Sequence, residues 1–149
     1  MKPTIFLRIA SILTLIHSIL HTIGGVFGKP APAAVAVFEQ MQTTRFPVFG
    51  VTRSYADFFM GLGLGITIFL TVEAVVFWLL GSLIKTDGAR LRPILAVFMI
   101  GYLVFAVVSY LFFFSGPVIT EVLIALFLGM AIVTAKPALV SRSEVARAS

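Results

Sequence analysis

Two histidines, His17 and His21, stand four residues apart in the segment HSILHTIGG, inside an apolar run of the chain. Residues at this spacing share one face of an α-helix. A polar side chain inside a membrane-length helix is costly unless it has a partner or a function. The pair therefore suggests helix-to-helix hydrogen bonding, proton transfer with a nearby carboxylate, or ligation of a metal or haem.

Three acidic residues in the apolar runs are candidate partners. At about 1.5 Å per helical residue, His21, Asp57 and Glu121 fall within roughly 10 Å of one another along the membrane normal. Glu73 lies about 24 Å deeper than Asp57 on the same predicted helix, where His17 is within reach through one water. We expect an outer cluster of His21, Asp57 and Glu121, with Arg53 and Tyr110 beside it and with His17 and Glu73 below.

Each candidate also has a structural interpretation. Arg53 lies four residues before Asp57, a spacing at which opposite charges form a surface ion pair. Glu121 is expected in a first helical turn, where the helix dipole favours a carboxylate. The segment GLGLG offers Gly61 and Gly65 as a close-packing pair, and it lacks the strand that a nucleotide-binding loop requires.

A metal or haem at His17 and His21 is an open alternative that the sequence does not favour. The chain contains two histidines and no cysteine. It has no HExxH segment and no third histidine to complete the usual set of ligands. The cofactor is therefore unassigned.

The composition explains what must position these residues. Of 149 residues, 60% are hydrophobic and 11% are charged, which is typical of membrane proteins rather than soluble domains. Four apolar runs are long enough, or nearly so, to cross a bilayer. They predict an all-α, four-helix transmembrane bundle as a single domain over 1–149, with spans at 5–26, 55–84, 94–114 and 118–135.

The predicted connections differ in character. The loop 27–53 contains Pro30 and Pro32 and then a short helix at 33–42, which we expect to cap the bundle or to lie on the membrane surface. Ser115, Gly116 and Pro117 are expected to form the turn between the last two helices. Lys2 and Arg8 before an apolar run resemble a secretory signal, but the run is longer than a signal core, so we expect no cleavage.

The basic residues predict the orientation. Three of the eleven lie on one side, in the loop 27–53, and eight lie at the amino terminus, in the loop 85–93 and in the tail 136–149. Cytoplasmic loops of membrane proteins carry the excess of Lys and Arg. We therefore expect both termini in the cytoplasm and the first loop outside, in the cell membrane, and no binding to nucleic acid.

The segments HSILHTIGG and RSYADFFMGLGLG together resemble the paired motifs of a family of small four-helix bacterial integral membrane proteins. The resemblance implies the four-crossing fold and no established activity. In construction only, the chain is also similar to the membrane sterol isomerases and the sigma-2 receptor group, which place acidic and histidine residues in an apolar cavity.

The residues leave three functions open. The first is a membrane protein that binds an apolar ligand or a partner subunit, because buried polar residues in small bundles mostly serve packing. The second is an enzyme that acts on a lipophilic small molecule by histidine and carboxylate proton transfer. The third is a proton-coupled transporter, which at this size would have to be a homo-oligomer.

Overall fold

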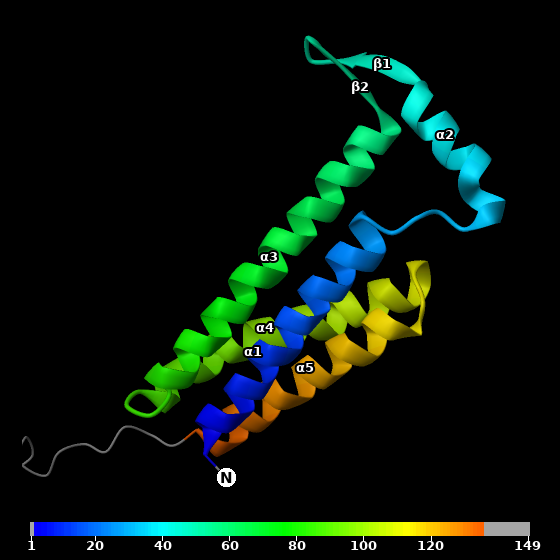
Figure 1. Cartoon of the computed structure of the whole chain (residues 1–149). Helices are drawn as coiled ribbons and strands as arrows, with labels where there is room; N and C mark the ends of the chain where they lie inside the picture. The colour runs from blue at the N-terminus through cyan, green and yellow to red at the C-terminus, as the bar shows by residue number, and fades with distance from the viewer. Residues whose placement is uncertain (1, 136–149) are drawn as a thin grey trace, which may run out of the picture. The chain divides into compact units, whose positions relative to one another are not determined.

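Helices make up most of the computed structural model, which describes residues 2–135 (Figure 1). Four helical segments are long and apolar enough to cross a membrane: Pro3–Val26, Tyr55–Leu83, Gly88–Phe112 and Ser115–Thr134. They confirm the prediction of four long apolar helices, with shifted ends, and their crossing of a membrane stays a prediction. The tail 136–149, with its basic residues Lys136, Arg142 and Arg147, lies outside the described residues.

The chain divides into two compact units whose boundaries fall inside helices. Unit 1 comprises Met1–Thr14 and Glu73–Ser149, and unit 2 comprises Leu15–Val72. The boundaries lie within α1 (Pro3–Leu20) and α3 (Tyr55–Leu83). Each unit is described separately below, and the predicted single domain over 1–149 stays a prediction.

Unit 1 contains the hydrophobic core. The start of α1 and the end of α3 contribute to it together with α4 (Gly88–Phe112) and α5 (Ser115–Thr134). Phe77 of α3, Leu95 of α4 and Leu128 of α5 have no exposed surface. The remaining buried members of this cluster are Phe6, Leu7, Ala10, Leu80, Ile84, Tyr102, Ile124, Ala125, Ala131 and Ala135.

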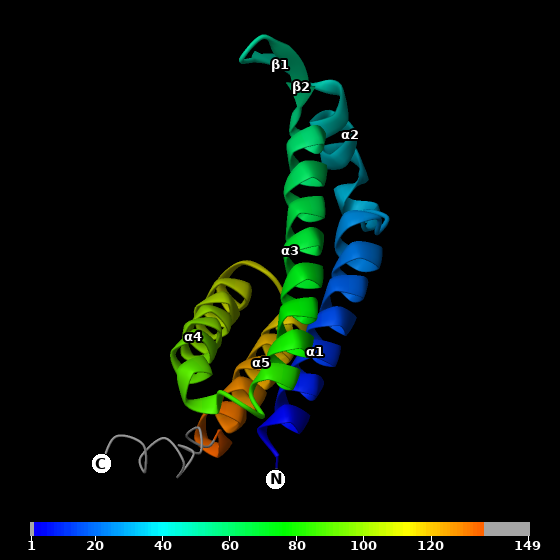
Figure 2. The ribbon, with the colours of Figure 1, turned by 90° about the vertical axis from the view of Figure 1, so that its left-hand side faces the viewer.

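The turn between α4 and α5 lies earlier than the sequence predicts. It consists of Phe113 and Phe114, and Ser115 already begins α5. Pro117 therefore belongs to the first turn of the helix, where a missing backbone N–H leaves no hydrogen bond unmade. The two helices run side by side and are joined at one end, so they form an antiparallel pair (Figures 1 and 2).

The loop before α4 is shorter than the predicted loop at 85–93, because the helix starts earlier than predicted. Asp87 precedes the helix, which begins at Gly88 and contains Pro93 as its sixth residue. Because the first four N–H groups of any helix lack an intrahelical acceptor, a proline this early removes few hydrogen bonds. Arg90 and Arg92 are therefore helical, and the Arg90 guanidinium lies 3.5 Å from the Asp87 carboxylate.

Unit 2 contains a β-hairpin that the sequence analysis missed. The strand β1 (Arg45–Val48) pairs antiparallel with β2 (Val51–Ser54), and Val48 faces Val51 at the turn. Phe49 and Gly50 form the tip, with φ of 44° and 85°. Positive φ at both central residues is the signature of a type I′ turn, which matches the twist of the strands. The ring of Phe46 stacks on Phe58 of α3, with centroids 6.1 Å apart.

A short helix also lies in the first loop. A 3₁₀ turn, η2 (Pro32–Ala34), leads into α2 (Val35–Thr43), close to the predicted helix at 33–42. None of the residues of α2 is buried.

The end of the first helix departs from regular α geometry. A π-helical turn, η1 (His21–Val26), follows α1 directly. Its wider turn adds one residue to the helical path, and such turns are frequent at functional sites. Val26 is buried while Gly25 is exposed. The extra residue thus places Val26 on the buried face, where a regular α-helix continuing from His21 would place Gly25.

Candidate functional site

The polar residues of the first helix in unit 2 form a ladder of hydrogen bonds with α3. The Ser18 hydroxyl lies 3.1 Å from the carbonyl oxygen of Thr67 and 2.9 Å from the hydroxyl of Thr71. The Thr22 hydroxyl lies 2.9 Å from the hydroxyl of Thr67. We call Ser18, His21 and Thr22, together with Gly63, Thr67 and Thr71, the polar ladder. Bonds of this kind hold membrane helices together.

His21 belongs to this ladder. Its Nε2 atom lies 3.1 Å from the backbone carbonyl oxygen of Gly63 on α3. A carbonyl oxygen accepts and never donates, so Nε2 must carry the proton. The hydroxyl of Thr67 donates to the same oxygen at 3.2 Å. His21 thus bonds to the backbone of a second helix, where the sequence predicts a bond to a carboxylate.

Gly63 is the glycine of GLGLG that makes the close approach. A Cβ atom at Gly63 would lie 2.9 Å from a methyl group of Val26, closer than real Cβ contacts allow. A Cβ atom at Gly61 or Gly65 would meet nothing within 4 Å among the described residues. The predicted Gly61–Gly65 packing pair is therefore corrected, because the inner face of α3 carries the middle glycine.

Asp57 caps the start of its own helix. Its carboxylate accepts a hydrogen bond from the backbone N–H of Ser54 at 2.8 Å, and the Ser54 hydroxyl accepts one from the N–H of Asp57 at 3.2 Å. These reciprocal bonds form a capping box. Arg53 donates instead to the carbonyl of Thr52. Within residues 2–135, Asp57 forms no ion pair with Arg53 and no hydrogen bond with His21.

A bond between His21 and Glu121 stays a prediction, because the two residues belong to different units. The same holds for the predicted approach of His17 to Glu73. His17 is 7% exposed, and its Nδ1 atom is buried with no hydrogen-bond partner among the described residues. Tyr110, which was expected beside the outer cluster, is 77% exposed on α4.

Glu73 has a partner within unit 1. The phenol of Tyr102 on α4 donates to its carboxylate at 2.6 Å. The Thr14 hydroxyl lies 3.4 Å from the same phenol oxygen and donates to the carbonyl of Ala10 at 2.9 Å. Tyr102 is buried and Glu73 is half-buried. The sequence analysis did not pair Tyr102 with Glu73.

Glu121 is the most deeply buried acidic residue of the described chain. It is 0% exposed and accepts a hydrogen bond from the Ser109 hydroxyl at 2.9 Å, while its Oε2 atom has no partner. It lies beyond the first turn of α5, because that helix begins at Ser115. The prediction that Glu121 lies in a first helical turn and is stabilised there by the helix dipole is therefore wrong.

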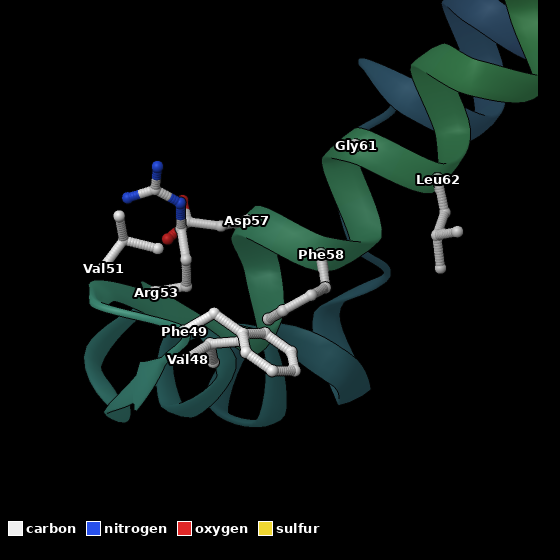
Figure 3. Close-up of a pocket in the computed structure, with 8 residues that line it drawn as sticks. All are labelled: Val48, Phe49, Val51, Arg53, Asp57, Phe58, Gly61 and Leu62. Atoms are coloured by element: carbon white, nitrogen blue, oxygen red, sulfur yellow. The ribbon is translucent and has the colours of Figure 1, made fainter.

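An open pocket of about 430 Å³ lies in unit 2, between the hairpin and the start of α3 (Figure 3). Arg53 and Asp57 are its charged residues, and the others are apolar or glycine: Val48, Phe49, Val51, Phe58, Gly61 and Leu62. Arg53 extends from β2, while Asp57, Phe58, Gly61 and Leu62 follow one another along α3. A surface of this kind suits a ligand with an apolar body and a charged head.

No group of three or more His, Cys, Asp or Glu side chains within residues 2–135 is placed to hold a metal ion. Comparison with known protein families, curated proteins and solved structures finds no match to this chain. The family resemblance of its two motifs therefore stays a prediction.

Proposed function

We propose that this protein is an integral membrane protein that binds an amphipathic ligand at the pocket between the hairpin and α3. The observation that carries the proposal is the lining of the pocket, where one cation and one anion border an otherwise apolar surface. Ligand sites are mostly apolar with a few polar groups that fix orientation. An acyl chain or similar apolar body would contact Phe58 and Leu62.

The charged residues of the pocket have free capacity for a ligand. Asp57 uses one carboxylate oxygen, Oδ2, in its capping box. Arg53 uses one guanidinium nitrogen on the exposed carbonyl of Thr52. A guanidinium has five N–H donors, and a carboxylate has acceptor sites on both oxygens. The pair would therefore suit a zwitterionic head group, with its anionic part on Arg53 and its cationic part on Asp57.

The polar ladder supports binding over histidine chemistry. Within unit 2, His21 donates to a backbone carbonyl and Asp57 bonds to Ser54, so these two side chains do not form the histidine–carboxylate pair that proton transfer would use. An enzyme and a proton-coupled transporter are therefore the less favoured functions. A partner subunit in place of a ligand is the remaining form of the binding proposal.

The placement in the cell membrane is part of the proposal. We infer a four-helix bundle with both termini in the cytoplasm and the hairpin outside, because the loop 27–53 carries three of the eleven Lys and Arg residues. The exposure of α2 favours a position on the membrane surface or against a partner. A reporter fused after Ser149 should be active in the cytoplasm, and one inserted near Gln42 should not.

Native mass spectrometry of the gently extracted full-length protein tests the ligand. We expect a retained lipid or other amphiphile in the wild type and a clear loss of it in the Phe58→Ala and Arg53→Gln variants. Val104→Ala, on an exposed position of α4, is the matched control. Equal retention in all four proteins would contradict a site at the pocket, and a retained protein would favour the partner subunit.

A further inference from the structure

Arg8 of α1 is held against one face of α3 within unit 1. Its guanidinium carbon lies 3.5 Å from the centroid of the Trp78 ring, and its Nη2 atom donates to the Ser82 hydroxyl at 2.9 Å. Trp78 and Ser82 are four residues apart and therefore share a face of the helix. A Cβ atom at Gly81 would lie 3.4 Å from the Nε atom of Arg8, so this glycine permits the close approach. The ring and the hydroxyl together fix the position of the cation.

The Arg8 cation has no carboxylate partner among residues 2–135. The described ion pair joins Arg90 and Asp87, and the Nη1 atom of Arg8 is buried without a hydrogen-bond partner. Asp57 is far along the same helix from Ser82, because they are the third and the twenty-eighth residues of α3. A charged side chain in a membrane-length helix is costly unless it has a partner or reaches the interface. The contacts of Arg8 with Trp78 and Ser82 thus orient its charge without neutralising it.

The end of unit 1 that contains Arg8 is strongly basic. Five Lys and Arg residues lie at the start of α1, just after α3 and in the first turns of α4: Lys2, Arg8, Lys85, Arg90 and Arg92. Within residues 2–135, Asp87 is the one acidic residue at this end, and it is paired with Arg90. Basic residues next to membrane helices attract anionic lipids. The charge of this end therefore complements an anionic partner.

The surface beside Arg8 is open to such a partner. The Trp78 side chain is 48% exposed, and Ser82 and Lys85 are exposed. The Ser82 hydroxyl accepts the bond from Arg8, while its own O–H has no described acceptor. Tryptophan is enriched at the membrane–water interface, where its ring lies at the level of the lipid head groups. The apolar contact and the free donors of a lipid site are thus adjacent on one helix face.

We propose that Arg8, Ser82 and Lys85 bind the phosphate group of an anionic phospholipid at the membrane interface, with its acyl chain against Trp78. A guanidinium group suits a phosphate because it can form two parallel hydrogen bonds with it. The choline group of a zwitterionic lipid would instead meet the like charges of Arg8 and Lys85. This inference rests on the proposed placement in the membrane and is independent of the pocket in unit 2.

The fluorescence of Trp78 provides a direct measurement, because Trp78 is the single tryptophan of the chain. Bromine atoms on an acyl chain quench an indole that they contact. The full-length protein is placed in nanodiscs of phosphatidylcholine and phosphatidylglycerol, with either lipid brominated, and quenching is normalised to unbrominated discs. We expect phosphatidylglycerol to be preferred at Trp78 by about fivefold or more in the wild type, and by less than about twofold in Arg8→Gln.

Arg90→Gln is the matched control for charge. It removes the same charge from the same end of unit 1, but the Arg90 side chain is 85% exposed and already lies beside Asp87. It should keep the preference of the wild type. Arg8→Lys, which retains the charge without the planar guanidinium group, should keep part of it. Circular dichroism and thermal melting in phosphatidylcholine discs identify any variant that has lost its fold.

Two further comparisons identify the source of the phosphate and separate the two sites. Inorganic phosphate at matched ionic strength should not restore the fluorescence, whereas restoration would indicate a site for free phosphate. Arg53→Gln, which tests the pocket in unit 2, should keep the lipid preference. Quenching in proportion to lipid content in the wild type, equal losses in folded Arg8→Gln and Arg90→Gln variants, or restoration by inorganic phosphate would overturn the proposal. A protein that does not enter nanodiscs would overturn the membrane placement and this site with it.

Discussion

The imidazole Nε2 of His21 and the backbone carbonyl oxygen of Gly63 lie 3.1 Å apart on two different helices. The contact is possible because Gly63 has no side chain and because the π-helical turn places Val26 against the same residue. One glycine of α3 thus receives both an imidazole and a methyl group from the other helix. The histidine motif and the glycine motif of the sequence meet at this point.

Replacing Gly63 with alanine should destabilise the protein. The new methyl group would lie 2.9 Å from Val26, whose branched side chain has little freedom to move away. We expect a loss of about 1–3 kcal/mol in the free energy of unfolding, measured by denaturant titration in mixed micelles. Gly61→Ala and Gly65→Ala, where the space is open, should be neutral or should stabilise the helix by up to about 1 kcal/mol. Equal losses at all three positions would contradict this packing.

His21→Ala and Thr67→Val should each cost about 0.5–1.5 kcal/mol in the free energy of unfolding. Both side chains donate to the carbonyl oxygen of Gly63, at 3.1 Å and 3.2 Å. Because they share one acceptor, the double variant should differ from the sum of the single variants by about 0.5 kcal/mol or more. Strict additivity in this double-mutant cycle would show that the two groups act independently.

Ser54→Ala should destabilise the start of α3 by about 0.5–2 kcal/mol, because it removes the N-cap hydroxyl. Asp57→Ala should have a similar cost, since its carboxylate satisfies the N–H of Ser54. Arg53→Gln should change stability by less than about 0.5 kcal/mol, because its bond is to an exposed carbonyl. A larger effect of Arg53→Gln than of Ser54→Ala would instead support the ion pair expected from the sequence.

Phe49→Asn should stabilise the hairpin. Phe49 has φ of 44° and a fully exposed side chain, so it bears the cost of a left-handed conformation without burying its ring. Asparagine tolerates this conformation, and we expect a gain of about 1 kcal/mol, read from slower amide hydrogen exchange in β1 and β2. Gly50→Ala should have the opposite sign, because φ at Gly50 is 85°. If Phe49 contacts a ligand, Phe49→Asn should also lower ligand retention while it raises stability.

Hydrophobicity and helix-breaking residues predicted the four apolar helices well. The start of α3 at Tyr55 was predicted exactly, since Arg53 and Ser54 end the polar loop there. The start of α5 was misplaced because Pro117 was interpreted as part of a turn, although the first turn of a helix accepts proline equally well. The hairpin was missed because its turn is Phe-Gly instead of the usual Asn-Gly.

Pairing of the buried polar residues could be predicted only in part. Depth along the helices limited which side chains could meet, but backbone carbonyls are available at every residue and leave no trace in the sequence. His21 forms its hydrogen bond with such a carbonyl, that of Gly63. The capping box at Ser54 and Asp57 did have a sequence signal, a serine followed three residues later by an acidic residue before an apolar run.

Because of the π-helical turn at His21–Val26, the buried positions before the turn and those after it follow two patterns that differ by one residue. One additional residue in a helix rotates everything beyond it by about 100° relative to an unbroken α-helix. In a regular α-helix, the spacing of Thr14, Ser18 and His21 would place Gly25 next on the inner face. The extra residue in the turn gives that position to Val26 instead. An alignment of this helix with a regular one would need a single-residue gap within the turn. A shortened chain that lacks one of the two glycines there would have a regular α-helix in place of the π turn, and Val26 would still face Gly63.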